Sequence, residues 1–430
     1  MKGDSRSHGL WEASASAGPA TPVLQGHTHA DVVVIGAGFT GLSAALHLAE
    51  GGASVAVLET VDIGFGGSGR NVGLVNAGMW VMPEALPGEL GPLHGGRLLE
   101  LLGDGPSLVY DIVERHGIDC EAVRRGTLHC AVGASGLANI TERARQWQAL
   151  GAPVTLLDAR ETAEKTGTHA YRGSLLDMRA GTIQPLAYVR GLARAAVAAG
   201  ARLHAHSPVD GLEDVGTHWR VRSSTGGEVQ AQWVIVATNA YTGPNGVWPE
   251  LGAELVRLPY FNMATRPLSA KTRELILPGL QGAWDTRDVL SSFRLDKAGR
   301  LIFGSVGALR GTGLAIHRSW GRRALAKLFP VLGGVEFEHE WYGWIGMTPN
   351  ALPRFHKLAR NTVSFSGYNG RGIATGTTFG QQLAKLVLGQ TKEEDLPLPA
   401  THAEPVSLRP VREAYYEVGA QVAHLVSARL

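Results

Sequence analysis

Residues 31–59 read DVVVIGAGFTGLSAALHLAEGGASVAVLE, and this stretch decides the fold. Its opening apolar run, 31–35, is rich in β-branched residues, breaks at the glycine turn 36–38 and continues as a helical pattern. A second apolar run, 54–58, ends in the acid Glu59. The order strand, glycine turn, helix, strand, acid predicts a βαβ unit that binds the ADP half of a dinucleotide.

The glycines of this unit each have a separate physical role. Gly36 allows the tight turn, Gly38 lets the backbone approach a pyrophosphate, and Gly41 lets the helix pack against the strand. The helix N-terminus supplies free N–H groups and a positive dipole end. Glu59 lies where a carboxylate accepts hydrogen bonds from a ribose 2′-OH, which argues against a 2′-phosphorylated nucleotide. The predicted contacts are Gly36, Gly38, Phe39, Thr40, Gly41 and Glu59.

Composition narrows the class of protein. The length of 430 residues predicts two domains, and a content of 44% hydrophobic and 18% charged residues predicts a soluble protein. The formal net charge of +2 gives no reason to expect nucleic acid or an anionic membrane as partner. The N-terminus has no uninterrupted apolar stretch typical of a secretory signal, so we expect a cytoplasmic protein. Residues 32–49 are apolar, but the glycine turn and His47 argue against an integral membrane segment. The two cysteines permit one disulfide, although two buried thiols are favoured, and no metal-ligand spacing occurs.

The α/β pattern is interrupted and then resumes. We expect a Rossmann-like domain assembled from discontinuous segments, which is typical of flavoproteins, and an α+β second domain with an antiparallel sheet that binds substrate. A nicotinamide dehydrogenase, the competing interpretation, more often keeps its dinucleotide domain contiguous. The predicted boundaries are 30–80, 181–250 and 343–395 for the nucleotide domain, 81–180 and 251–342 for the substrate domain, 1–29 for an irregular lead-in and 396–430 for a peripheral helix.

Five motifs occur in an order that points to one family. They are DVVVIGAGFTGLSAALHLAEGG, GGSGRNVGLVNAGMW, WVIVATNAYTG, RLIFGSVG and GYNGRGIATGTTFG. With these, the chain resembles the D-amino-acid-oxidase-like family of FAD-dependent oxidoreductases over about residues 10–395. The nearest branch is similar to γ-glutamylputrescine oxidase and bacterial L-pipecolate oxidase.

The resemblance implies FAD and further cofactor residues. The loop of Gly67, Ser68, Gly69, Arg70 and Asn71 is expected beside the pyrophosphate and flavin, and the alternative is a solvent-exposed loop with a surface arginine. Other implied contacts are Val209 at the adenine, Ala237 and Thr238 at a strand end, and Gly370, Arg371, Gly372 and Ile373 at the N1–C2=O edge of the flavin. No cysteine follows Cys130 and no histidine lies in 66–78, so FAD is expected to be bound without a covalent link.

The implied reaction is oxidation of a small amine or amino acid, such as the secondary amino acid L-pipecolate, to the imine by hydride transfer to flavin N5. Reoxidation by O₂ would give H₂O₂. Because the strand 301–304 lacks the lysine that sarcosine oxidase-like relatives place over the flavin, a dehydrogenase that reduces a quinone stays open, as does a γ-glutamylputrescine-type amine oxidase. A flavoprotein without turnover is the remaining alternative.

Candidate substrate-site residues are Tyr260, Phe293, Trp344 and Arg371. Taken singly, aromatic residues of this kind are more often core residues than substrate contacts. Arg371 has two interpretations, a bidentate clamp on a substrate carboxylate or a cofactor and structural role, of which the second is favoured.

Overall fold

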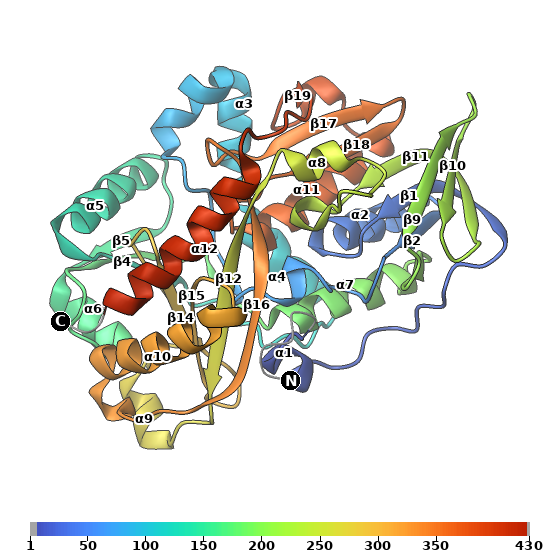
Figure 1. The fold of residues 1–430 in the computed structure, drawn as a ribbon. Coiled ribbons are helices and arrows are strands. Elements are labelled where there is room, and N and C mark those ends of the chain that lie inside the picture. The colour runs from blue at the N-terminus through green and yellow to red at the C-terminus, as the bar shows by residue number, and fades with distance from the viewer. Residues whose placement is uncertain (1–6, 428–430) are drawn as a thin grey trace.

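A computed structural model describes residues 7–427. Its strands form a nine-stranded sheet, an eight-stranded sheet and a two-stranded ribbon made of β3 (Leu74–Val75) and β7 (Gly181–Thr182). The two large sheets lie side by side, with the nine-stranded sheet on the right in Figure 1.

The nine-stranded sheet is built around the βαβ unit. β1 pairs in parallel with both β11 and β2, and Val34 is in register with Ile235 and Val57. Along the sheet the order is β19-β17-β18-β11-β1-β2-β8, with β10 and β9 continuing from β11 as a meander. The strands are β1 (His27–Ile35), β2 (Val55–Leu58), β8 (Arg202–His204), β9 (Val209–Asp214), β10 (Trp219–Ser223), β11 (Glu228–Val236), β17 (Arg354–Ala359), β18 (Thr362–Ser366) and β19 (Ala400–Thr401). The α/β class with a parallel, Rossmann-like sheet is confirmed.

Three helices pack beside this sheet: α2 (Phe39–Glu50), α7 (Pro185–Ala198) and α11 (Gly372–Val387). Small residues allow α2 and α11 to approach closely. A Cβ atom on Gly380 would lie 2.5 Å from the Thr40 carbonyl oxygen and 2.7 Å from the Ser43 Cβ. The Ser43 hydroxyl donates to the Thr377 carbonyl at 2.6 Å. The N-terminal ends of two helices from distant parts of the chain are therefore held next to each other.

The eight-stranded sheet has the order β16-β12-β15-β14-β13-β4-β6-β5 and is antiparallel except where β13 meets β4. One of its faces buries an aromatic core that includes Phe261, Phe293 and Phe303. Its strands are β4 (Thr127–Cys130), β5 (Val154–Leu157), β6 (Ser174–Asp177), β12 (Val256–Thr265), β13 (Gly282–Asp285), β14 (Ser291–Leu295), β15 (Leu301–Val306) and β16 (Phe337–Met347).

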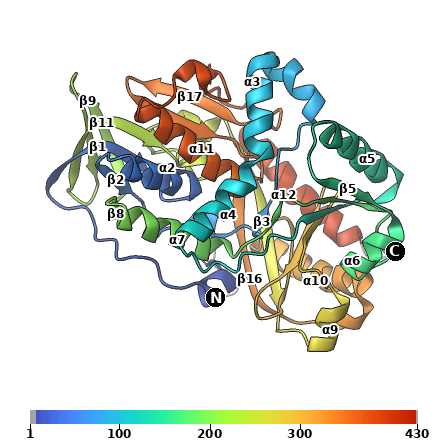
Figure 2. The same ribbon diagram turned by 180° about the vertical axis from the view of Figure 1, so that it is seen from behind.

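The remaining helices surround and connect the sheets. Seen from behind, α3 and α4 pass between the two halves, where both contact α11 (Figure 2). On the other side α12 crosses β12 (Figure 1). These helices are α3 (Leu86–Gly103), α4 (Gly105–Arg115), α5 (Gly133–Ala149), α6 (Ala159–Thr166), α8 (Pro249–Ala253), α9 (Ala270–Leu275), α10 (Gly311–Leu328) and α12 (Arg409–Val426), with short 3₁₀ turns η1 (Gly67–Gly69), η2 (Pro83–Ala85), η3 (Asn239–Tyr241), η4 (Pro330–Leu332) and η5 (Glu393–Asp395).

The N-terminal segment differs from the irregular lead-in that we expected. It contains α1 (Leu10–Ser14), and both Leu10 and Trp11 are buried. The Trp11 indole N–H donates to the Asn71 carbonyl at 2.8 Å. Burial of these two apolar side chains anchors the segment to the glycine-rich loop.

Three further expectations concern single features. Both cysteines, Cys120 and Cys130, are buried and free, which confirms the favoured prediction of two buried thiols over a disulfide. The C-terminal helix forms as α12. Between residues 7 and 427, no helix combines the length and the apolar character that crossing a membrane requires.

Candidate functional site

The glycine turn of the βαβ unit has the geometry that its residues predict. Gly36 adopts a φ of +106°, and a Cβ atom there would lie 2.9 Å from the Ala237 carbonyl oxygen. A Cβ atom on Gly41 would lie only 1.9 Å from the Gly36 carbonyl oxygen. Gly38 caps α2 without a side chain, and the next N–H, that of Phe39, donates to the Ser68 hydroxyl at 3.0 Å. The turn therefore brings Gly36, Gly38, Ala237 and Ser68 together.

The Glu59 carboxylate, predicted to contact a ribose, is hydrogen-bonded to the main chain of this turn. Its partly buried carboxylate accepts from the N–H groups of Ala37 at 2.8 Å and of Val61 at 3.0 Å. Burial raises the pKa of Glu59, and these backbone donors oppose that shift. The Glu59 carbonyl accepts from the Ser207 N–H at 2.8 Å, and Ser207 lies two residues before Val209, the first residue of β9.

The glycine-rich loop is interior, so the alternative of a surface arginine is wrong. Arg70 is 2% exposed, and its guanidinium carbon lies 4.3 Å from the Phe65 ring centroid. The Arg70 carbonyl accepts from Asn262 Nδ2 and from Trp341 Nε1, both at 3.0 Å. These bonds tie the loop to β12 and β16, and so to the eight-stranded sheet.

Asn71 shapes the loop from within. Its Nδ2 donates to the carbonyls of Gly67 and Ser68, each at 3.0 Å, and its Oδ1 accepts from the Gly73 N–H at 2.9 Å. All three bonds are internal to residues 67–73, with Gly69 closing η1 between them. The side chain of Asn71 therefore supports the backbone that is predicted to face the cofactor.

The glycine turn at 370–373 lies near the start of α2. Gly370 has a φ of +84°, Arg371 is the N-cap of α11, and Gly372 is its first helical residue. The Tyr368 hydroxyl lies 2.7 Å from the Thr40 hydroxyl, which joins this turn to the start of α2. The Ile373 side chain is buried in the adjoining core.

The three aromatic candidates occupy different environments. Tyr260 hydrogen-bonds Ser292 at 2.6 Å, and burial raises its pKa. Phe293 is fully buried beside Phe329, which favours its core interpretation. Trp344 is half-buried, and its carbonyl would lie 3.4 Å from a Cβ atom on Gly67, so this residue adjoins the glycine-rich loop.

The Arg371 side chain points away from the glycine turn into a group of aromatic rings. Its Nη1 donates to the Ala77 carbonyl at 2.7 Å, and its guanidinium carbon lies 5.0 Å from the Trp80 ring and 5.1 Å from the Trp284 ring. The His129 ring stacks on Trp284 with 3.5 Å between centroids. The guanidinium group of Arg371 therefore lies beside Trp284 of β13, in the eight-stranded sheet.

Arg143 adjoins these residues, because its Nη2 donates to the Trp80 carbonyl at 2.7 Å. Four residues near Arg371 were absent from the predicted site: Trp80, His129, Arg143 and Trp284. They come from separate parts of the chain, and neither their spacing nor their type marks them in the sequence. The one local signal is that Trp80 is the last residue of the motif GGSGRNVGLVNAGMW.

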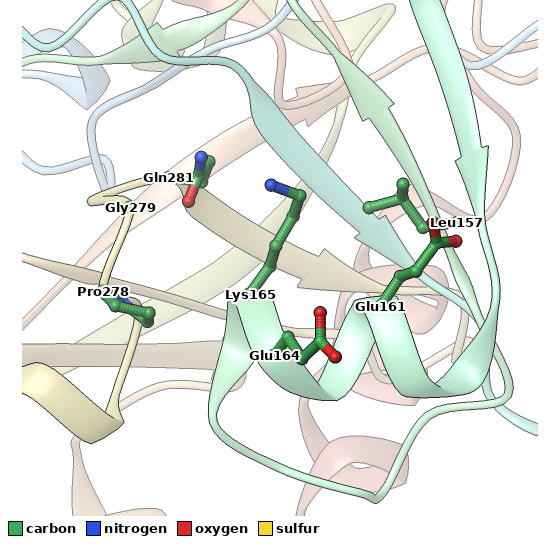
Figure 3. A pocket seen from close by; sticks show the side chains of 7 residues that line it. All are labelled: Leu157, Glu161, Glu164, Lys165, Pro278, Gly279 and Gln281. Atoms are coloured by element: carbon green, nitrogen blue, oxygen red, sulfur yellow. The ribbon is translucent and has the colours of Figure 1, made fainter.

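One surface hollow lies away from both glycine turns. A cavity of about 380 Å³ between α6 and the segment 278–281 is lined by Leu157, Glu161, Glu164, Lys165, Pro278, Gly279 and Gln281 (Figure 3). None of these residues belongs to the glycine turns. The predicted site residues are all absent from this lining.

The residues of the two turns fit an FAD molecule. Replacing any of Gly36, Gly38 or Gly41 would put a Cβ atom within 3.0 Å of a neighbour, so the backbone is bare where a pyrophosphate must approach. The N-terminal ends of α2 and α11 both contribute N–H groups and a positive dipole end. When bound, FAD supplies the hydride acceptor.

Comparisons with known proteins agree with this geometry. Residues 31–386 match the DAO family, described as FAD dependent oxidoreductase. The gamma-glutamylputrescine oxidoreductase of Escherichia coli (strain K12) is 32% identical over 90% of this chain and 92% of its own length. A probable oxidoreductase, OrdL, of Rhizobium meliloti (strain 1021) is 31% identical over 90% of this chain and 89% of its own.

A solved structure shares the fold. The glycine oxidase from Geobacillus kaustophilus superposes with a TM-score of 0.71 at 20% identity, covering 87% of this chain and 99% of the other. The family match rejects the nicotinamide alternative for the glycine turn. The chain belongs to the DAO family and is an FAD-dependent oxidoreductase.

Proposed function

We propose that this protein oxidises a small amine or amino acid at the carbon–nitrogen bond, with a secondary amino acid such as L-pipecolate as substrate. The observation that carries the proposal is the convergence of two glycine turns and two helix N-termini at the junction with a second, antiparallel sheet. The product is the imine, which forms when the carbon next to the nitrogen loses a hydride and the nitrogen then loses a proton to solvent.

In this proposal the first turn holds the ADP half of FAD through Gly36, Gly38 and Gly41, with Glu59 at the ribose and Val209 at the adenine. The glycine-rich loop and the strand end at 237–238 follow the cofactor toward the flavin, and the turn at 370–373 directs helix N–H groups to the flavin N1–C2=O edge. The protein's part in catalysis is orientation, exclusion of water and electrostatic stabilisation. A neutral substrate amine needs no protein base to lose its hydride, so the proposed mechanism assigns no catalytic histidine.

For the substrate we propose the space between the flavin edge and the eight-stranded sheet. Tyr260 and Trp344 face it from β12 and β16, and Arg371 enters it from the start of α11. The second candidate substrate is γ-glutamylputrescine, because a relative of 32% identity over nearly the whole chain is a gamma-glutamylputrescine oxidoreductase.

The electron acceptor is proposed as O₂, with H₂O₂ as product. A quinone is the competing acceptor, because β15 presents no lysine at 301–304. Mixing the reduced enzyme with air-saturated buffer and, separately, with a soluble quinone distinguishes the two. Fast reoxidation with stoichiometric H₂O₂ supports O₂, and fast reoxidation by the quinone alone overturns it.

The test of the substrate is anaerobic reduction of the bound flavin by a panel of L-pipecolate, L-proline, sarcosine, D-alanine and γ-glutamylputrescine. Bleaching of the flavin by L-pipecolate, and far slower bleaching by the others, is the expected result. Preferential bleaching by γ-glutamylputrescine would establish the second candidate, and bleaching by none of the five would refute amine oxidation of this class.

A further inference from the structure

The C-terminal helix α12 carries an apolar stripe on its outer side. Nearly half of the large apolar side chains that are exposed in the described part of the chain lie within 408–426. Six of them recur at alternating intervals of three and four residues, which is the spacing of the contact face of a coiled-coil helix. This set, called the α12 stripe, consists of Leu408, Val411, Tyr415, Val418, Val422 and Leu425.

Contacts with the rest of the molecule fix the rotation of α12 about its own axis. On the inner side of the helix, Ala420 and His424 are buried. The Glu417 carboxylate accepts hydrogen bonds from Arg310 at 2.9 and 2.6 Å. Figure 1 shows α12 on the near side of the molecule, and Figure 2 shows it on the far side. The α12 stripe, on the opposite side of the helix from these contacts, is therefore a fixed part of the surface.

The stripe is large enough for a stable protein interface. Its members are between 41% and 74% exposed. At the usual full areas of valine, leucine and tyrosine, and with the neighbouring Tyr416 and Val426, these fractions amount to on the order of 800 Å². The largest apolar patch of an ordinary monomer covers about 300–600 Å². Each partner in an interface of standard size contributes about 800 Å², so the stripe has the area that a stable dimer needs.

The order of the side chains favours a second copy of this chain as the partner. Read from either end, the α12 stripe presents a leucine and then a valine. In an antiparallel pair of α12 helices, the facing residues are Leu408 with Leu425, Val411 with Val422, and Tyr415 with Val418. One two-fold axis, passing between positions 416 and 417, relates all of these pairs. The stripe is thus complementary to itself, which an isologous dimer requires.

The neighbours of the stripe fit the same arrangement. The axis places Arg412 of one copy opposite Gln421 of the other, so no like charges meet there. It also places Ala414 opposite Gly419, and these small residues let the two helices approach closely. In a parallel pair each side chain would meet its own counterpart, and two Tyr415 rings would share one layer. The antiparallel pair gives each tyrosine a smaller valine as its neighbour.

A membrane surface fits the stripe less well. Helices that lie in a membrane interface are rich in lysine and arginine on their polar face. The helix α12 contains two arginines and no lysine. Arg409 is paired with Glu413 at 2.9 Å, so Arg412 is the one arginine of this helix outside an ion pair in the described structure. The stripe therefore lacks the basic surroundings that would attract anionic lipid.

We propose that α12 is a dimerisation helix, and that two copies of this chain associate through antiparallel packing of their α12 stripes. The contact uses the same patch on both copies, so assembly closes at the dimer. The inference concerns a surface outside the glycine turns and does not depend on the substrate that the enzyme oxidises.

The test is the mass of the purified holoenzyme in solution, measured by sedimentation velocity over a dilution series. We expect a dimer at about 10 μM, because interfaces of this size bind with micromolar or tighter affinity. Val411→Glu and Val422→Lys should each weaken association at least about a hundredfold, because the axis places the unpaired charge in the apolar contact twice. Both side chains are exposed in the single chain, so FAD content and melting temperature should stay at their wild-type values.

A double variant tests the direction of the pairing. Val411→Glu and Val422→Lys in the same chain place each glutamate opposite a lysine of the second copy, so affinity should return to within about tenfold of wild type. Within one chain these positions lie about 16 Å apart along the helix and cannot pair. In a parallel dimer glutamate would meet glutamate, and association would stay weak. Val331→Glu is the matched control, because Val331 is 56% exposed but lies outside α12.

The outcomes are distinct. A dimer that both single variants dissociate, that the double variant restores and that Val331→Glu leaves intact supports the inference. A wild-type protein that is monomeric at 10 μM and above, or a dimer that survives Val411→Glu, overturns it. Failure of the double variant to restore the dimer also overturns it, because the antiparallel register is then wrong. Flotation of a monomeric protein with vesicles of phosphatidylcholine and phosphatidylserine, lost in Val411→Glu, would assign the stripe to a membrane instead.

Discussion

The packing of Gly41 against Gly36 makes Gly41→Ala the sharpest test of the FAD site. A Cβ atom at residue 41 would lie 1.9 Å from the Gly36 carbonyl oxygen, whereas contacts below 3.0 Å are essentially never seen, so the turn must move by about 1 Å. The obstacle is main chain, which has no rotamer to escape into. Overpacking of this kind costs roughly 1–3 kcal/mol, and here the displaced atoms are those that meet the pyrophosphate.

The assay is FAD content by visible absorbance, together with thermal unfolding. Gly41→Ala is expected to purify with little FAD and to unfold several degrees lower than wild type. Gly96→Ala is the matched control, because Gly96 lies in helix α3 with nothing within 4 Å of the added atom. It should keep its FAD and gain up to about 1 kcal/mol from helix propensity. A Gly41→Ala protein with full FAD and wild-type unfolding temperature would refute this account of the turn.

Three other predictions concern the cofactor and the C-terminal helix. Glu59→Ala should lower both FAD retention and stability, because the carboxylate also holds the Ala37 N–H, and loss of FAD alone would show that this bond is unimportant. Acid precipitation should release all the FAD into the supernatant, and flavin in the pellet would contradict a non-covalent site. Burial lowers the pKa of His317 to about 4 and that of His424 to about 3. The folded protein therefore favours the neutral rings, and this contribution to the free energy of unfolding is fully present above pH 6.5. It falls as the pH drops toward 4, by up to about 3 kcal/mol for His317. Thermal unfolding against pH should therefore be flatter in His424→Phe than in wild type, and parallel curves would contradict this assignment.

The parts of the fold that local pattern encodes were predictable. The βαβ unit needs only a strand, a glycine turn and a helix within 29 residues, 31–59, and each is visible as a hydrophobic period or a turn residue. The same holds for the turn at 370–373, where glycines precede an apolar helix. In both places the conformation depends on neighbours in sequence.

The grouping of Arg371 with Trp80, His129 and Trp284 could not be predicted, because these residues meet only through tertiary structure. His129 and Trp284 are brought together by a parallel pairing of β4 and β13. Arg371 reaches them from the other half of the molecule. The burial of Trp11 could not be predicted either, because it depends on a contact with Asn71, 60 residues away.

The central claim is that this chain holds FAD at its two glycine turns and reduces it with a secondary amino acid such as L-pipecolate. The most direct measurement is the visible spectrum of the purified protein, recorded anaerobically before and after addition of L-pipecolate and of its decarboxylated analogue piperidine. The account predicts a flavin spectrum that L-pipecolate bleaches and piperidine leaves intact. A colourless protein, or a flavin that both compounds bleach equally, would contradict it.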